Sequence, residues 1–485
     1  MKKLLLLLAV LSSVCFAQKQ TDTQRLMKEA LKPSALQENL RVLTDEIGGR
    51  VPGTPALDKA VRWGADALKA AGADDVQVES YSIPHSWQEG ATRVSITSPV
   101  QFNLRAVSVG WAPRTSAPVK ARLVDVGKGD AAGFSKAGDI SGALLLVHTE
   151  TMKKWDDLFA EYMRAPMVID AAVKGKAAGI AFISTREHDL LYRHINTNDG
   201  QLDRLPIVIV AREDGERAAR LAAQGKPVEA EFDLPNKVGG EFETANVIGE
   251  IKGKTHPDEY VLLGAHLDSW DLGTGALDNG CNAALVIDAL RAIKASGVQP
   301  ERSIRFALFT GEEQGTLGSL AYVRKHRDEM DKIAGVLIFD EGTGRVTGFS
   351  LGGRQDILAP VTKLVAPFKS WGATKLTTDA FVGTDNLDFL LEGVPNLVAN
   401  QVEANYLENY HASSDTYDKV DFPELKKNVA IAATLMYVLA NAPRVGPRQD
   451  HSQVDALVKG THLDDQLKSF GMWSAYEQGS RGRAH

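Results

Sequence analysis

Strands and helices alternate along the second half of this 485-residue chain, and this alternation constrains the fold more than any other sequence feature. Four apolar runs have the length and composition of buried strands, at residues 260–265, 304–310, 335–339 and 396–399. Helical patterns lie between them, notably at 283–295, 319–329 and 357–368. The alternation predicts an α/β fold with a mostly parallel, mixed sheet sandwiched by helices.

Polar residues follow three of these strands at the point where each strand ends. His266 and Asp268 follow the first strand, Glu312 and Glu313 follow the second, and Asp340 follows the third. Ligands gather outside the carboxyl ends of the strands in such sheets. Isolated acids there are costly unless they are solvated, paired or bound to a cation. Because the pattern recurs at three strand ends, we expect a metal site at this edge.

Two histidines and three acids form the candidate ligand set: His266, Asp278, Glu313, Asp340 and His411. Two imidazoles and three carboxylates suit a pair of Zn²⁺ ions with one bridging carboxylate. Two such ions, about 3.5–4 Å apart, can share a hydroxide nucleophile and stabilise a developing oxyanion. The set therefore predicts two Zn²⁺ ions per chain and hydrolysis of an amide or ester.

Four runs of residues resemble the co-catalytic dizinc aminopeptidase family, and they occur in the family's order: HLDSWDLGTGALDNG, FTGEEQGTLGS, FDEGTG and YHASSDTYDKVD. They are most similar to the carboxypeptidase Q (plasma glutamate carboxypeptidase) branch, which shares the His-Leu-Asp-Ser-Trp-Asp run. The resemblance covers nearly the whole mature chain. It implies a phosphorylase/hydrolase-like zinc peptidase core with an inserted protease-associated domain.

The resemblance also implies roles for individual residues. His266 with Asp340 would bind one zinc, Glu313 with His411 the other, and Asp278 would bridge them. Glu312 would be the general base, and Asp268 would orient His266 through its second ring nitrogen. Asn279, which stands where family members often have aspartate, is not expected to be a ligand.

Each of these residues alone has an ordinary interpretation. His266 could be the polar end of a strand, the Glu312–Glu313 pair could favour the helix dipole, and Asp340 could belong to a turn. His411 depends mainly on the family pattern. Three further residues receive no catalytic role: Asp271 and Asp385 are left unassigned, and Cys281 is predicted to be a small buried hydrophobic residue because no base is paired with it.

A chain of this length is too long for one ordinary core, so more than one domain is expected. Residues 116–236 consist of short β runs, Gly/Asp turns and two helical stretches, a self-contained α+β texture. We predict a signal peptide at 1–17, an N-terminal part of the peptidase domain at 18–115, the inserted domain at 116–236, the catalytic domain at 237–443 and a C-terminal tail at 444–485.

The first residues, MKKLLLLLAVLSSVCFAQ, have the pattern of a signal peptide cleaved after Ala17. Val14 makes a lipid anchor on Cys15 a poor fit. We expect a secreted or periplasmic protein with no membrane attachment after cleavage, since no later stretch is apolar enough to cross a bilayer. Cleavage leaves Cys281 as the only cysteine, which excludes an internal disulfide. A net charge of −7 without a basic stripe argues against nucleic-acid binding.

These observations together predict an exported zinc-dependent exopeptidase that hydrolyses short peptides or dipeptides through a metal-bridging hydroxide, with Glu312 as general base. Exopeptidase action is implied by the family. Two alternatives are a glutaminyl cyclase-like acyltransferase, which works with a single zinc, and a non-catalytic receptor-like protein, which needs missing ligands. Aminopeptidase, dipeptidase or carboxypeptidase action, the side-chain preference, the physiological substrate and the oligomeric state stay open, although relatives are often homodimers.

Overall fold

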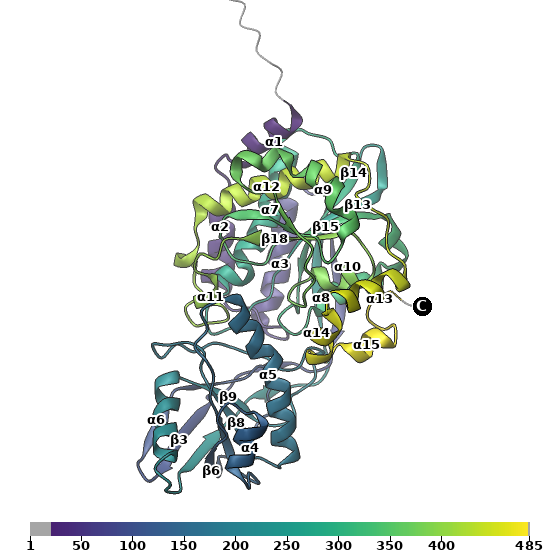
Figure 1. Ribbon diagram of the computed structural model, residues 1–485. Coiled ribbons are helices and arrows are strands. Elements are labelled where there is room, and N and C mark those ends of the chain that lie inside the picture. Colours follow the sequence, from purple (N-terminus) through teal and green to yellow (C-terminus); the bar gives the residue numbers. More distant parts are fainter. Residues whose placement is uncertain (1–20, 484–485) are drawn as a thin grey trace, which may run out of the picture.

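An eight-stranded mixed sheet forms the centre of the upper of two bodies in Figure 1. The computed structural model describes residues 21–483, so the signal peptide predicted at 1–17 lies outside the described residues. In spatial order the strands are β1 (Asp75–Ile83), β12 (Phe242–Ile251), β14 (Arg302–Phe309), β13 (His256–His266), β15 (Ile333–Ile338), β18 (Asn396–Gln401), β16 (Val346–Ser350) and β17 (Lys375–Thr377).

The four central strands of this sheet, β14, β13, β15 and β18, run parallel, and antiparallel pairs flank them on both sides. Every residue of β15 is buried, as a strand covered on both faces requires. The mixed α/β sheet predicted from the sequence is therefore confirmed, and the carboxyl ends of its central strands meet at one edge.

Helices cover both faces of the sheet. The larger core contains side chains from α1 (Asp22–Ala30), α2 (Leu36–Arg41), α3 (Pro55–Ala70), α7 (Cys281–Ser296), α9 (Leu358–Leu364) and α12 (Phe422–Asn441). A second cluster packs α8 (Leu317–Lys325) and α10 (Asn386–Leu391) against the opposite face. The short helix α11 (Tyr406–Asn409) precedes His411. None of the described helices is long and apolar enough to cross a membrane.

The lower body contains a second eight-stranded sheet (Figure 1). Its strands, in spatial order, are β4 (Phe102–Leu104), β3 (Arg93–Ser98), β10 (Glu229–Asp233), β6 (Val119–Asp125), β7 (Leu144–Val147), β8 (Gly179–Ile183), β9 (Ile207–Val210) and β5 (Ala106–Ser108). Its helices are α4 (Ala131–Ala137), α5 (Trp155–Lys174) and α6 (Arg212–Ala222). We call this body the inserted domain; its identity as a protease-associated domain stays a prediction.

The sequence-based boundary at residue 116 does not coincide with the start of this second sheet. Strands β3, β4 and β5 precede residue 116, yet they pair with β10 and β9 of the inserted domain. β3 and β4 alternate buried with more exposed positions, so they lack the continuous apolar run that marks β7, β8 and β9. Each is assigned to this sheet by its pairing with strands, and the partners β9 and β10 lie far along the chain. A local sequence pattern therefore does not predict which sheet these strands join.

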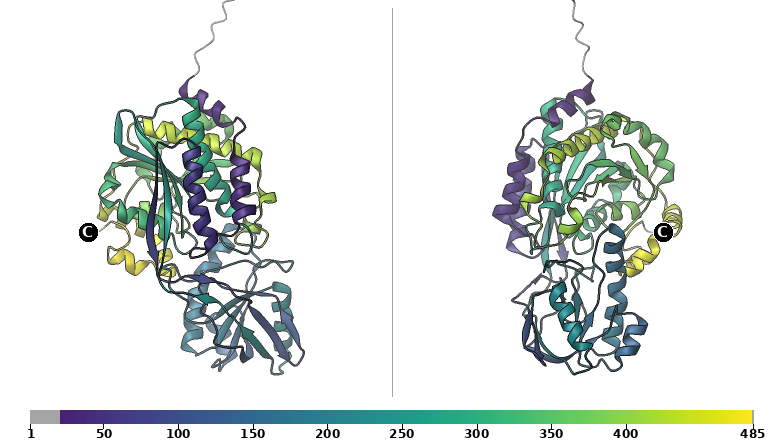
Figure 2. Two further views of the ribbon diagram at one scale, coloured as in Figure 1. Left: turned by 180° about the vertical axis from the view of Figure 1, so that it is seen from behind. Right: turned by 60° about the vertical axis from the view of Figure 1, so that its left-hand side comes forward.

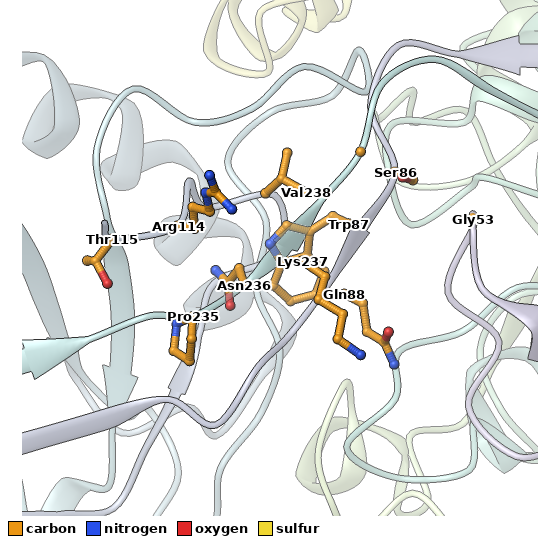
Figure 3. A pocket seen from close by; sticks show the side chains of 11 residues that line it. Gly53, Ser86, Trp87, Gln88, Arg114, Thr115, Pro235, Asn236, Lys237 and Val238 are labelled. Atoms are coloured by element: carbon orange, nitrogen blue, oxygen red, sulfur yellow. The ribbon is translucent and has the colours of Figure 1, made fainter. Parts of the chain in front are cut away.

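Two crossing segments link the bodies, and they pair as β2 (Trp87–Gln88) and β11 (Lys237–Val238). A pocket opens beside this linker (Figure 3). Among the described residues its lining includes Trp87, Arg114 and Lys237 but no acid and no histidine. The linker pocket therefore lacks the ligands for the predicted metal ions.

The C-terminal segment, predicted as a tail with sparse anchors, folds into three helices: α13 (His451–Gly460), α14 (Leu463–Ser469) and α15 (Trp473–Glu477). Its anchors are spaced by four residues, as in Val454 with Val458 and Leu463 with Leu467, and all four are buried. Figure 2 (right) shows these yellow helices beside the upper end of α5, and α14 contacts α5. The segment thus reaches the inserted domain across the edge where the parallel strands end.

Candidate metal centre

The ring of His266 is oriented by the backbone that follows it. His266 ends β13 and its side chain is buried. Nδ1 lies 3.0 Å from the Asp268 carbonyl oxygen. Because a carbonyl only accepts hydrogen bonds, Nδ1 donates, and in the neutral, metal-binding form of the ring Nε2 carries the lone pair. Nε2 faces two carboxylate oxygens, Oδ1 of Asp340 at 3.1 Å and Oδ1 of Asp278 at 3.2 Å.

The ring of His411 has a matching arrangement on the other side of Asp278. Its Nδ1 donates to the carbonyl oxygen of Arg193 at 3.0 Å. Its Nε2 lies 2.9 Å from Glu313 Oε2 and 3.3 Å from Asp278 Oδ2. The two oxygens of Asp278 therefore face different histidines, the arrangement that a carboxylate bridging two metal ions requires.

The spacing of these donor atoms fits zinc. Tetrahedral Zn²⁺ with bonds of about 2.0 Å holds neighbouring ligand atoms about 3.3 Å apart. The four histidine–carboxylate distances lie between 2.9 and 3.3 Å. Asp278 Oδ2 and Glu313 Oε1 are buried, yet neither accepts a hydrogen bond from any described residue. Lone pairs that face one another in a buried site need a cation between them, so the residues present fit the predicted ions.

The electrostatics of the site lead to the same conclusion. Burial disfavours a charged imidazole, but the neighbouring carboxylates outweigh it and raise the pKa of His266 well above its ordinary value and that of His411 to about 9. Burial raises the pKa of Glu313 to about 7. The protein alone thus favours protons on these groups, because the carboxylates outnumber the cations around them. Divalent ions would take the place of those protons.

Glu312 lies beside the ligand set without completing it. Its Oε2 is 3.9 Å from His266 Nε2, farther than the carboxylates of Asp278 and Asp340. Burial raises the pKa of its carboxyl well above the ordinary value. Glu312, His266 and Asp340 can also be grouped as three potential ligands, and so can His266, Asp278 and Glu313. The longer distance separates Glu312 from the four close contacts, as expected of a proton acceptor next to the metal.

The structure shows which atom of Asp268 accepts a hydrogen bond from His266. Its backbone carbonyl, rather than its carboxylate, accepts the Nδ1–H of His266, and the carboxylate Oδ1 lies 3.6 Å from that nitrogen. The carboxylate instead accepts the backbone N–H groups of Glu312 and Glu313, at 3.4 and 3.3 Å. Asp268 therefore connects the end of β13 to the turn after β14.

Two residues that support the ligand loops were not identified from the sequence. Arg50 is fully buried, and its guanidinium donates to four backbone carbonyls, those of Gly48, Leu267, Thr274 and Gly275. Asp415 accepts the backbone N–H groups of residues 276, 277 and 278. The only local signals are an arginine within a glycine-rich turn and an acid four residues after His411.

The residues left without a role are now placed. Asp271 pairs with the buried Arg193 of the inserted domain, at 2.9 Å. Asn279 donates to the Phe339 carbonyl and is not a ligand. The thiol of Cys281 is buried in the larger core, as predicted for a small hydrophobic residue. The carboxylate of Asp385 is buried, and neither oxygen has a hydrogen-bond partner among the described residues.

Four of the five candidate ligands, Asp278, Glu313, Asp340 and His411, line a cleft of about 660 Å³ between the two bodies, and His266 lies behind them. Trp155, Phe159 and Tyr162 of α5 line it from the inserted domain, and Phe470 and Met472 line it from the C-terminal segment. The Tyr162 hydroxyl hydrogen-bonds to that of Tyr410, next to His411, at 3.0 Å. The inserted domain and the C-terminal segment therefore enclose the cleft from two sides.

Comparisons with known proteins indicate a peptidase family. Residues 246–436 match Peptidase family M28. The chain is 27% identical to carboxypeptidase Q of Mus musculus over 414 residues, which covers 85% of this chain and 87% of that protein. Carboxypeptidase Q of Homo sapiens is 26% identical over 419 residues, with 85% and 86% of the two chains covered.

Solved structures extend the similarity to the whole fold. A Peptidase M28 precursor from Shewanella amazonensis SB2B superposes with a TM-score of 0.79 at 28% identity, covering 88% of this chain and 98% of that one. BSAP, a zinc aminopeptidase from Bacillus subtilis, has the same fold, with a TM-score of 0.65 at 20% identity over 85% and 94% of the two chains. Residues 246–436 therefore form a Peptidase family M28 domain, and the chain is a carboxypeptidase Q-like metallopeptidase of the zinc exopeptidase class.

Proposed function

We propose that this protein is an exported peptidase that binds two zinc ions and acts on short peptides or dipeptides with a free amino group. One observation carries the proposal: the two carboxylate oxygens of Asp278 face different histidines. One oxygen faces His266, which lies beside Asp340, and the other faces His411, which lies beside Glu313. A binding protein that had lost its metal site would not keep both pairs intact.

The lining of the cleft favours the amino end of a peptide over its carboxyl end. Beyond the ligands, the charged side chains among its described lining residues are all acids: Asp156, Glu312, Glu341 and Asp379. No lysine or arginine is among those described residues. A substrate ammonium group would find a partner among these acids, whereas a terminal carboxylate placed beside them would be repelled.

Zinc, when bound, would supply Lewis-acid activation of water and of the scissile carbonyl. The protein's own residues then have separate tasks. Asp268 and Arg193 hold the two imidazoles through backbone carbonyls, so that Nε2 of each ring faces the ligand carboxylates. Glu312, whose Oε2 lies 3.9 Å from His266 Nε2, accepts the proton of the attacking water and returns it to the leaving amine.

The enclosure of the cleft limits the length of the substrate. Phe159 and Tyr162 of α5 each lie against Phe470 of the C-terminal segment, with ring centroids 6.5 and 5.6 Å apart. A long or folded polypeptide would have to separate these rings to reach the metal ligands. Short peptides fit without this rearrangement, which supports exopeptidase rather than endopeptidase action.

Export is the second part of the proposal and depends on residues 1–17 alone. A cleaved signal peptide would place the enzyme in the periplasm or outside the cell. Sequencing the N-terminus of the protein recovered from the cell exterior or periplasm tests this, with Gln18 expected as the first residue. A homodimer, as in many relatives, also stays a prediction.

One substrate screen tests the catalytic proposal. Free dipeptides, N-blocked dipeptides and C-blocked dipeptides are assayed with and without a chelator. We expect chelator-sensitive cleavage of the free and C-blocked peptides and little cleavage of the N-blocked ones. The reverse preference would make the protein a carboxypeptidase. Ring closure of an N-terminal glutamine without hydrolysis would instead identify a glutaminyl cyclase-like enzyme.

A further inference from the structure

A stretch of the inserted domain, residues 190–196, lies directly against the loop that carries His411. Tyr192 and Ala412 form an antiparallel β-bridge. The backbone N–H of Arg193 donates to the His411 carbonyl at 2.9 Å, and Ser413 donates to the Leu191 carbonyl at 3.1 Å. The two segments, more than two hundred positions apart in the sequence, therefore pair like the strands of a small sheet.

The same pairing fixes the imidazole of His411. Nδ1 of the ring donates to the Arg193 carbonyl at 3.0 Å, so Nε2 is the atom that faces Asp278 and Glu313. His411 also has a φ of 57°, in the left-handed region that non-glycine residues seldom adopt. Such a conformation persists only where the surroundings hold it, and here the surroundings are residues of the inserted domain.

The position of the Arg193 backbone depends in turn on its side chain, which is completely buried. The guanidinium donates to Glu89 Oε2 at 2.7 Å, to Asp271 Oδ1 at 2.9 Å and to the Ser108 carbonyl. It also lies 5.2 Å from the ring centroid of Trp87. A buried cation is stable only when it is paired, so the two carboxylates determine where Arg193 can be.

Asp271 comes from the peptidase domain, from the loop between His266 and Asp278. Arg193 therefore contacts both ligand-bearing loops, the first through its side chain and the second through its backbone. Figure 2 shows the inserted domain below the sheet of the peptidase domain, so the Arg193 contacts cross the junction of the two bodies. This links the placement of the inserted domain to the geometry of the site formed by Glu313 and His411.

We propose that Arg193, fixed by Asp271 and Glu89, is a positioning residue for the zinc ion held by Glu313 and His411, so that the inserted domain completes the metal centre. This inference rests on the proposed function, because it takes those two residues as zinc ligands. It assigns Asp271 a role in metal affinity, although Asp271 contacts no ligand side chain.

The alternative is that Arg193 only attaches one domain to the other. Such a role would affect the stability of the chain but would change the affinity for both zinc ions alike or not at all. A positioning role weakens one ion selectively, since His266 and Asp340 are held by Asp268 and by strands of the peptidase domain. The two roles therefore differ in what happens to each ion separately.

The test compares Asp271→Asn and Glu89→Gln with Asp214→Asn in the full-length protein. Asp214 is a matched control, because it also pairs with an arginine of the inserted domain, Arg105 at 2.8 Å, and that arginine does not contact the His411 loop. Zinc affinities of the two sites are measured by competition with a chromophoric chelator. Visible spectra of the cobalt-substituted protein report on the geometry of each site.

For Asp271→Asn and Glu89→Gln we expect one zinc ion to bind about 10–100-fold more weakly, the usual effect of removing a residue that orients a metal ligand. The other ion should bind as in the wild type, and excess zinc should restore kcat. Unchanged affinity for both ions in the folded variants, or an equal change in Asp214→Asn, would overturn the inference. A wild-type protein that binds no pair of ions would instead refute the proposed function itself.

Discussion

Arg50→Lys is the substitution whose effect can be worked out most directly from the structure. The guanidinium of Arg50 donates to four backbone carbonyls over 2.7–2.9 Å, and three of them belong to the loop between His266 and Asp278. Lysine keeps the positive charge but has three donors on a single nitrogen. It cannot satisfy four carbonyls arranged around a planar fork, so at least one hydrogen bond to a charged group is lost and one buried carbonyl is left unpaired.

A hydrogen bond to a charged group contributes about 1.5–3 kcal/mol. We therefore expect Arg50→Lys to lower the free energy of unfolding of the zinc-free protein by at least this amount. Burial lowers the pKa of the Arg50 guanidinium to about 10, so the group stays charged at neutral pH. The expected loss of stability therefore holds at neutral pH. A loss of this size is a large fraction of the stability of an ordinary protein.

The assay is urea unfolding of the zinc-free protein, followed by tryptophan fluorescence, so that metal binding does not mask the change. Arg122→Lys is the matched control, because Arg122 is half-exposed and its ion pair with Asp139, at 3.5 Å, is open to solvent. We expect the control to stay within about 0.5 kcal/mol of the wild type. If Arg50→Lys also stayed within that range, the four hydrogen bonds would not support the loop as argued.

Four further predictions concern separate parts of the molecule. Glu312→Gln should keep both zinc ions and lose about two to four powers of ten in kcat; a fully metallated variant with normal kcat would exclude Glu312 as the base. Burial lowers the pKa of His194 to about 4, so the free energy of unfolding should fall as the pH drops from about 6.5 toward 4. Urea unfolding at several pH values should show this fall to be smaller in His194→Gln, by up to about 3 kcal/mol. Arg481→Met leaves the buried Asp388 without its partner at 2.8 Å and should cost about 3–5 kcal/mol in the same assay. Asp379→Asn should raise KM for peptides with a free amino group and leave kcat nearly unchanged, whereas an unaltered KM would remove Asp379 from ammonium binding.

The sequence predicted those parts of the site whose position follows from local order. His266, Glu313 and Asp340 directly follow parallel strands, and the carboxyl ends of such strands always meet at one edge. The proximity of these candidate ligands could therefore be predicted without a structure. The orienting role of Asp268 was predicted without naming the atom involved, because the sequence does not show in which direction a loop turns.

The supporting residues could not be predicted, because their partners lie far along the chain. Asp271 looks like a solvated acid until the inserted domain places Arg193 beside it. Arg50 belongs to a turn near the N-terminus, and the loop it supports begins 217 positions later at Leu267. The C-terminal helices were missed for a related reason, since each has only two or three apolar anchors and these become informative only once a second surface faces them.

The balance of charge explains why the two arginines and the ligand acids lie in one region. Arg193 is paired with Asp271 and Glu89, and Arg50 lies near Asp415 and Asp268, so these four acids have cations of their own. The three ligand carboxylates of Asp278, Glu313 and Asp340 form ion-pair contacts with His266 and His411 and with no arginine or lysine among the described residues. Two divalent ions would leave this set with one net positive charge, which favours the oxyanion that develops in peptide hydrolysis. A single ion would leave one net negative charge and oppose that oxyanion, so the arrangement of acids favours a two-zinc hydrolase over a one-zinc enzyme with the same fold.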